Sequence, residues 1–444
     1  MSATDPHHDT HQALHRTIEA VWRIESARVI AGLTCLTRDV GLAEDLGQEA
    51  LIAALEQWPQ TGIPDNPGAW LTATAKRRAI DLFRRNAVAQ RKHEDLARDL
   101  ATLEQTAPDL DSILDDPIGD DLLRLIFIAC HPVLSAESRA ALTLRLLGGL
   151  TTTEIARAFL TTEVTIAQRI VRAKRTLSDK HIPFEIPGTP ELAARLSSVL
   201  EVIYLIFNEG YSATAGDDLI RPILCDEALR LGRILAELTP QESEVHGLVA
   251  LMEIQASRTL ARIGPTGEPI LLVDQNRANW DLLLIRRGLD AIDRAASILD
   301  TNGSTNSTPT DISRARGPYL VQAEIAACHA RARMPSETDW HLIVSLYTEL
   351  AQLTPSPVIE LNRAVAVSMA SGPQAALGLV EALARDPSLA RYHLLPSVRA
   401  DLLYKLGRHD ESRAQFELAA SLTQNARERA LLLARAASCQ TPSS

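Results

Sequence analysis

Basic and amide side chains gather in one short segment, at residues 161–180. From Arg169 to Lys180 five basic residues stand against one acid, Asp179. Gln and Arg can form paired hydrogen bonds with base edges in a major groove, and the other cations can neutralise phosphate. The segment therefore predicts contact with duplex DNA. The candidate residues are Thr162, Thr165, Gln168, Arg169, Arg172, Lys174 and Arg175.

Two helices separated by a short turn must position these side chains. The first helix opens with a capping box formed by Thr151 and Glu154, and Leu150 with Ile155 can form a hydrophobic staple. The second helix is capped by Thr161 or Thr162, and its apolar positions have core spacing. The pattern predicts a helix-turn-helix with the second helix as the recognition helix. On this segment alone, an ordinary helical hairpin with a solvated basic face stays open. The predicted core positions are Ile166, Ile170, Ala173 and Leu177.

A second basic segment lies upstream, at residues 76–92. It holds seven basic residues and one acid, Asp81. Such local density is what phosphate contact requires, so the formal charge of −11 for the whole chain does not exclude a nucleic-acid partner. The candidate residues are Lys76, Arg77, Arg78, Arg84 and Arg85.

A helix is predicted at residues 42–58, with polar and apolar positions on different faces. Asp45, Gln48 and Glu49 form one exposed stretch. The stretch 59–68 is rich in Pro and Gly and is not expected to be helical. Trp70, which follows it, could stack on a base, but its place at the start of an amphipathic helix favours packing. The positions expected to pack are Leu46, Ala50, Ile52 and Ala53.

Residues 43–58 and 69–85 closely resemble region 2 of extracytoplasmic-function sigma factors, and residues 150–177 resemble their region 4. The resemblance covers roughly residues 10–185. It implies that Asp45, Gln48 and Glu49 dock on the β′ clamp of core RNA polymerase, with the β flap as a further partner. It also implies that the basic helix and the loop 59–68 hold a flipped base of the −10 element, and that the helix-turn-helix reads the −35 element of promoter DNA.

Gly47 departs from the family pattern, which usually has a larger apolar residue there. Gly in a helix interior costs up to about 1 kcal/mol. We therefore expect this helix to be locally weak.

The chain is expected to be all-α, because helix formers dominate and aromatic residues make up only 4%. We predict an unstructured leader at 1–13, a region 2 domain at 14–98, an acidic linker at 99–121, a region 4 domain at 122–182 and a helical domain at 191–437. By the resemblance, the linker would thread toward the polymerase active-centre cleft. The loop 301–310 has low complexity and is expected to be disordered.

The helical domain carries a weak repeat. Residues 405–419 have the spacing of a tetratricopeptide helix pair, with Gly407 in the tight turn and Ser412, Phe416 and Ala419 facing the partner helix. Residues 364–383 repeat this layout. The chain thus resembles the sigma-factor subgroup with a C-terminal tetratricopeptide-like extension, which we expect to modulate activity in cis.

Polar and aromatic residues also cluster in this domain, at 208–211, 274–281, 339–340 and 360–363. They could line a groove for a peptide, a ligand or the sigma domains. They could equally be helix caps and ties between repeats.

Other classes of protein are disfavoured. No nucleophile elbow, phosphate loop or zinc motif appears, so we expect no catalytic activity, cofactor or metal. The five cysteines are scattered, which fits a reduced cytoplasm, and no run is apolar enough to predict a membrane span. Two alternatives stay open: a ligand-sensing helix-turn-helix regulator with a tetratricopeptide-like sensor domain, and a repeat scaffold that merely resembles a sigma factor.

Overall fold

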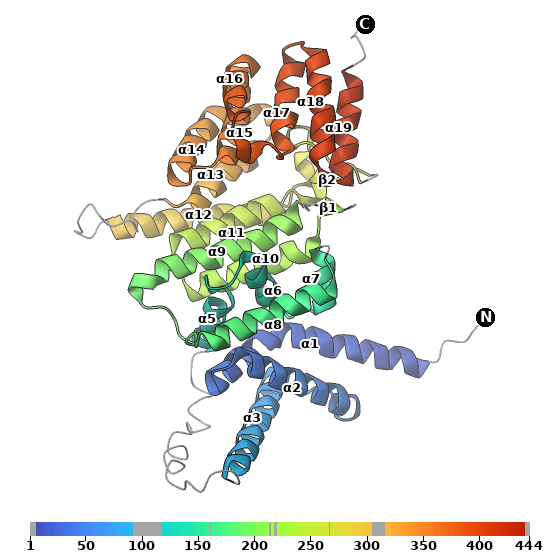
Figure 1. Cartoon of the computed structure of the whole chain (residues 1–444), viewed down its shortest axis with the longest axis vertical. Helices are drawn as coiled ribbons and strands as arrows, with labels where there is room; N and C mark the ends of the chain where they lie inside the picture. Colours follow the sequence, from blue (N-terminus) through green and yellow to red (C-terminus); the bar gives the residue numbers. More distant parts are fainter. Residues whose placement is uncertain are drawn as a thin grey trace. The chain divides into compact units, whose positions relative to one another are not determined.

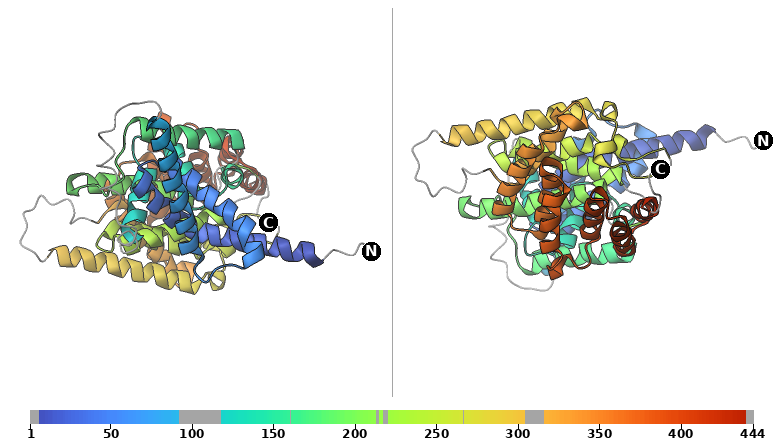
Figure 2. Two further views of the ribbon diagram at one scale, coloured as in Figure 1. Left: turned by 90° about the horizontal axis from the view of Figure 1, so that it is seen from below. Right: turned by 90° about the horizontal axis from the view of Figure 1, so that it is seen from above.

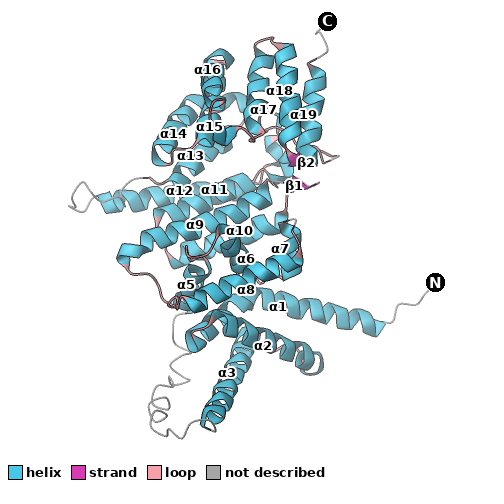
Figure 3. Ribbon diagram, in the orientation of Figure 1, coloured by secondary structure: helices cyan, strands magenta, loops and turns pink. Residues whose placement is uncertain are grey.

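The computed structural model describes residues 6–91, 118–159, 161–212, 215–216, 220–265, 267–303 and 316–439. Throughout these ranges the chain is helical apart from turns, short 3₁₀ segments and one pair of two-residue strands (Figure 3). The strands, β1 (Ala215–Gly216) and β2 (Gln424–Asn425), run parallel. The all-α prediction is confirmed.

The chain forms two compact units that divide between Val202 and Ile203, inside helix α9. The helices of the first unit (Figure 1) are α1 (Pro6–Thr37), α2 (Val40–Thr61), α3 (Pro67–Arg91), α5 (Ile118–Ala129), α6 (Ala136–Leu146), α7 (Thr152–Ala158), α8 (Glu163–Asp179) and the start of α9 (Thr189–Tyr211).

Polar contacts join the start of α9 to α5 and α6 within the first unit. Arg195 donates to the backbone oxygen of Phe127 at 3.0 Å, and Ser198 donates to that of Cys130 at 2.7 Å. The buried Arg139 on α6 donates to the Ser198 hydroxyl and pairs with Glu201 at 3.0 Å. The helix-turn-helix unit thus extends past the predicted boundary at residue 182 and includes one face of α9.

The second unit continues with helices joined mostly by short turns. Helix α12 is seen along its length in both views of Figure 2. The helices are α10 (Pro222–Leu238), α11 (Ser243–Ala256), α12 (Leu282–Gly303), α13 (Pro318–Arg331), α14 (Trp340–Leu353), α15 (Pro357–Ser371), α16 (Pro373–Leu383), α17 (Leu394–Lys405), α18 (His409–Leu422) and α19 (Ala426–Ser438).

The predicted repeat hairpins are present. Gly407 joins α17 to α18 with φ 73°, a conformation that favours glycine, and Gly372 (φ 93°) joins α15 to α16 in the same way. The predicted interface residues Phe416 and Ala419 are buried. Ser412 is buried as well, and its hydroxyl donates to the backbone oxygen of Ala400 on α17 at 2.8 Å.

The polar and aromatic clusters act as caps and ties. Asp339 caps α14 by accepting from the Leu342 amide at 2.9 Å. Arg277 donates to the backbone oxygen of His329 at 2.8 Å and to the hydroxyl of Thr338 at 3.1 Å. These contacts favour the second of the two interpretations given for the clusters.

Three local predictions were wrong. Helix α1 begins at Pro6, within the stretch expected to be an unstructured leader. Helix α2 continues through Pro59 to Thr61, because a proline in the last turn removes only one hydrogen bond before Gly62 ends the helix. Ile52, expected to pack, is 53% exposed, because it lies on the same helical face as the exposed Asp45, Glu49 and Glu56.

Other predictions fall on residues outside the described ranges. The acidic linker 99–121 lies outside these ranges except for residues 118–121, which begin α5. The loop 301–310 lies outside them from residue 304 onward, after the end of α12 at Gly303. Among the described helices, none is long and apolar enough to cross a membrane.

Candidate nucleic-acid interface

Helix α8 separates a buried row from an exposed one. Thr162 is its N-cap, and the Thr162 hydroxyl accepts from the Thr165 amide at 3.1 Å. Because buried positions recur every three or four residues, the polar positions between them are turned to solvent. The buried row consists of the four predicted core residues Ile166, Ile170, Ala173 and Leu177.

The exposed row carries the predicted DNA-contacting side chains. Gln168, Arg172 and Arg175 follow one another at spacings of four and three residues and are exposed, while Thr165 and Arg169 lie beside them and are half-buried. Arg175 pairs with Asp179 at 3.3 Å, a contact open to solvent on both sides. Arg172 is exposed and has no ion-pair partner within the described ranges, so its guanidinium group is available to a polyanion. Arg169 has no carboxylate within ion-pair distance in these ranges either, but it interacts electrostatically with Glu137.

Lys174 differs from the rest of the predicted set, because its ammonium group pairs with the carboxylate of Glu44 on α2. Glu44 is 4% exposed and also accepts from Arg145 Nε on α6 at 2.6 Å. Burial by itself raises the pKa of Glu44, but the two cations more than offset it and hold the pKa below its ordinary value. Glu44 therefore joins the N-terminal helices to the helix-turn-helix as a charged carboxylate.

A second contact joins the same elements near the start of α7. The predicted capping box is present: the Glu154 amide donates to Thr151 Oγ1 at 3.2 Å, and the Thr151 amide donates to Glu154 Oε2 at 2.8 Å. The other Glu154 oxygen accepts from Arg23 on α1 at 2.6 Å. Gly149 (φ 64°) allows close approach, since a Cβ there would lie 3.3 Å from the Arg23 Cα. We call these contacts, with the Glu44 pairs, the α1/α2–HTH contact.

The basic helix α3 presents most of its predicted cations to solvent. Arg77, Arg84 and Arg85 are exposed, and none has a carboxylate partner among the residues described. Lys76 is half-buried, and burial lowers its pKa. Arg78 donates to Glu49 on α2 at 2.8 Å.

Trp70 packs against protein. Its ring lies 5.2 Å from that of the buried Trp58 in an edge-to-face arrangement with an interplanar angle of 65°. The packing interpretation of Trp70 is the one the structure supports.

The three residues of α2 that were expected to form one exposed stretch differ in their surroundings. Asp45 is exposed and Gln48 is half-buried, whereas Glu49 is already paired with Arg78. Gly47 is buried, and a Cβ there would meet the Trp22 ring of α1 at 3.2 Å. The helix continues unbroken through Gly47, so the departure from the family pattern corresponds to close packing of Trp22.

Sequence reasoning missed two kinds of residue. Val164 and Val171 are 65% and 63% exposed and flank the polar row of α8, where apolar side chains could contact thymine methyl groups. Their seven-residue spacing on a polar face was the available signal. Glu44 and Arg145 were missed because their pairing joins residues about 100 positions apart, which periodicity does not reveal.

Comparison with known families matches three stretches of the chain. Residues 25–88 match Sigma-70 region 2, and residues 124–177 match Sigma-70, region 4. Residues 195–296 match a family of unknown function, DUF6596. The first two stretches contain α2 and most of α3 and α8, the helices that carry the predicted site residues.

Two curated proteins are similar to this chain. Uncharacterized protein R00370 of Rhizobium meliloti (strain 1021) is 43% identical over 397 residues, which cover 89% of each chain. Serine/threonine-protein phosphatase T of Trypanosoma brucei brucei (strain 927/4 GUTat10.1) is 34% identical over 85 residues, covering 18% of this chain and 17% of that protein. No solved structure matches. With region 2, region 4 and the DUF6596 stretch in one chain, the protein belongs to the sigma-70 family, as a sigma factor resembling the extracytoplasmic-function type with a C-terminal extension.

Proposed function

We propose that this sigma factor binds core RNA polymerase, recognises the −35 and −10 elements of its promoters and starts transcription there. The observation that carries the proposal is the exposed polar row of α8, in which Gln168 and Arg172 are free to meet a base edge and a phosphate. In this role Thr162, Thr165, Gln168, Arg169, Arg172 and Arg175 contact the −35 duplex.

We assign the contact with the −10 element to α3. Arg77, Arg84 and Arg85 supply exposed positive charge to a strand backbone, and Lys76 and Arg78 extend the row. Flipping a base out of the duplex costs a few kcal/mol, which these contacts must offset.

We assign the contact with core polymerase to the exposed face of α2. Asp45, Gln48 and Glu49 offer acceptors to basic residues of the β′ clamp, and the β flap is the expected partner of the region 4 unit. Sigma factors are not enzymes, and the role proposed here is one of binding and positioning.

Lys174 can join the DNA contacts only by exchanging its partner. Its ammonium group would leave the Glu44 carboxylate and meet a phosphate instead. The α1/α2–HTH contact therefore competes with DNA for one predicted residue.

Single-round transcription with purified core polymerase tests the proposal. We expect a promoter-specific transcript from the full chain, and its loss in Q168A/R169A and in R84A/R85A. A transcript that is independent of the chain, or DNA binding that needs no polymerase, would favour the ligand-sensing regulator instead.

We propose further that the C-terminal unit modulates activity in cis. A truncation that tests this must keep Arg195 and Ser198, because their contacts with Phe127 and Cys130 belong to the first unit. A chain ending after Val202 should differ from the full chain in transcript yield. Equal yields would refute modulation in cis and leave the sigma-factor assignment intact.

A further inference from the structure

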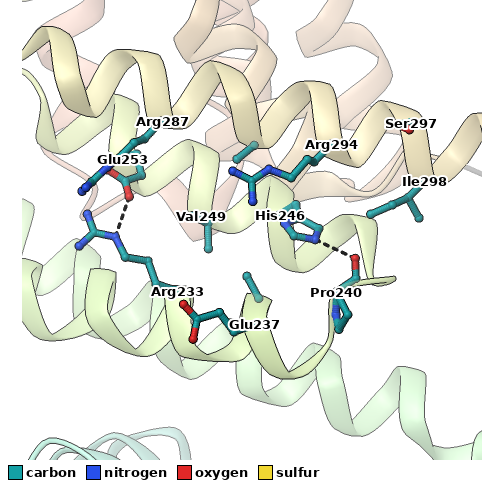
Figure 4. Close-up of a pocket in the computed structure, with 12 residues that line it drawn as sticks. Arg233, Glu237, Pro240, His246, Val249, Glu253, Arg287, Arg294, Ser297 and Ile298 are labelled. Atoms are coloured by element: carbon teal, nitrogen blue, oxygen red, sulfur yellow. Dashed lines mark hydrogen bonds and ion pairs between the residues drawn. The ribbon is translucent and has the colours of Figure 1, made fainter.

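The second unit contains a groove between α10, α11 and α12 with a volume of about 610 Å³ (Figure 4). Its buried acid, Glu253, is 1% exposed and accepts from Arg233 at 2.8 Å. Glu253 also lies beside Arg287 (Figure 4). Because this carboxylate already has cations around it, the lining of the groove does not specify the charge of a ligand.

Two apolar side chains on α8 have a more specific setting. Val164 and Val171 are 65% and 63% exposed, although the same helix buries four other apolar residues. A β-branched residue at an exposed helix position stabilises the helix less than Ala does, and its apolar surface stays in contact with water. Two such residues on one helix therefore lower the stability of the free chain and indicate a surface that contacts a partner.

Both valines lie on the face of α8 that points away from the core. At 3.6 residues per turn, one arc of about 60° holds four residues at spacings of four, three and four, and its centre lies about 160° from that of the buried row. These residues are Val164, Gln168, Val171 and Arg175, and all four are exposed. A surface that covers Gln168 must therefore also cover the valine on either side of it.

The neighbours of the valines favour duplex DNA as that surface. Gln168 can pair with adenine in a major groove, where the C5-methyl group of thymine is the apolar group on display. Arg172 is exposed and has no ion-pair partner among the described residues, so a protein that covered this face would have to neutralise it. A phosphate backbone supplies that charge and a thymine supplies the apolar contact.

The spacing of the valines limits which thymines they can meet. Seven residues at a rise of 1.5 Å place Val164 and Val171 about 10 Å apart along α8. Because base pairs rise about 3.4 Å per step, this distance corresponds to about three base pairs. Val164 lies in the first turn of α8, and the first residues of a recognition helix are those that contact base edges.

We propose that Val164 and Val171 are specificity-determining residues that read the C5-methyl groups of two thymines, about three base pairs apart, in the −35 duplex. The inference rests on the proposed function, because it adds two apolar contacts to the helix that is assigned to the −35 element. Each contact buries a methyl group and involves neither charge nor a hydrogen bond.

Replacing thymine by uracil tests the proposal, since uracil pairs as thymine does but lacks the C5-methyl group. The full chain bound to core polymerase first selects its preferred −35 duplexes from a library that is random at this element. Each thymine of a selected duplex is then replaced singly by uracil, and binding is measured by fluorescence anisotropy. We expect two positions at which uracil weakens binding of the native chain about fourfold, the effect of one buried methyl group.

Variants assign each position to one valine. V164A should bind the thymine and uracil duplexes equally at one of the two positions, and V171A should do so at the other. Both variants should fold, because Ala has a higher helix propensity than Val. V365A is the matched control, since Val365 is 37% exposed on α15 in the second unit, and it should keep the native difference at both positions.

Three outcomes overturn the proposal: no position sensitive to uracil in the native chain, a difference that keeps its full size in V164A and V171A, or equal weakening of both duplexes by these variants. The last would assign the valines to a protein surface such as the β flap. In each case a preference for particular −35 sequences that Q168A loses leaves the proposed function intact. If the complex selects no −35 sequence at all, the proposed function fails together with the inference.

Discussion

Glu44 on α2 and Lys174 on α8 form an ion pair that joins a helix of sigma region 2 to the second helix of the helix-turn-helix in region 4. The same carboxylate accepts from Arg145 at 2.6 Å. A buried carboxylate that pairs with two cations contributes to the free energy of unfolding. It does so mainly because removing any one of the three groups leaves a buried charge without its partner.

Replacing Glu44 by Gln should lower the free energy of unfolding. The amide keeps the shape but leaves Arg145 and Lys174 without a counter-charge, and charged hydrogen bonds contribute about 1.5–3 kcal/mol each. We expect a loss of about 2–3 kcal/mol, measured by urea unfolding of the full chain. The control is E49Q, because Glu49 lies on the same helix in an exposed pair with Arg78, which is worth about 0–1 kcal/mol. Equal losses in the two variants would contradict the role assigned to Glu44.

The contribution of Glu44 should also depend on pH. Its folded pKa lies below the ordinary value of 4.5, so the stabilisation is fully present above that value and is lost as the pH falls through the folded pKa. The difference in unfolding free energy between the native chain and E44Q should thus be largest near neutral pH and shrink in acid. A difference that stays constant down to acid pH would show that Glu44 does not act through its charge.

The amphipathic helices and caps were within reach of sequence reasoning. The Thr151–Glu154 box and the buried row of α8 follow from local spacing, and both are present as predicted. Gly407 was placed in its turn by the same kind of argument, because a glycine between two helical patterns has few other uses.

Contacts between segments that are distant in the sequence could not be predicted from it. The sequence places Lys174 on α8, yet its partner Glu44 lies 130 positions away. Likewise, the sequence alone suggests that Gly47 weakens α2 locally, whereas the structure shows that the Trp22 ring packs against it. Such pairs depend on how helices pack, and a helical period carries no information about which helix a face will meet.

Replacing Gly47 by a larger residue should lower the free energy of unfolding. A Cβ at this position would lie 3.2 Å from the Trp22 ring, so the branched side chain in G47L has no space and overpacking should cost about 1–3 kcal/mol. Gly32 on α1 is the matched control, because no atom lies within 4 Å of a Cβ built there. G32A should instead stabilise by up to about 1 kcal/mol through its helix propensity. Urea unfolding of both variants measures the effects, and a G47L chain as stable as the native one would refute the packing role.

The exposed row of α8 should divide into base-reading and phosphate-neutralising residues. Gln168 can form a bidentate pair with adenine, so Q168A should cost about 1–3 kcal/mol on the preferred −35 sequence and little on others. Arg172 is exposed and without an ion-pair partner among the described residues, so R172A should weaken binding to all sequences alike and reduce the salt slope by about 1.

Fluorescence anisotropy of the sigma factor bound to core polymerase, on matched and altered −35 duplexes at several salt concentrations, measures both effects. R391A is the control, because Arg391 is exposed in the second unit, away from α8 in the chain. Should R172A change the preference among sequences while Q168A does not, the two roles would have to be exchanged. Should neither differ from R391A, α8 would not be the recognition helix, because its two best-placed side chains would then make no contact with DNA.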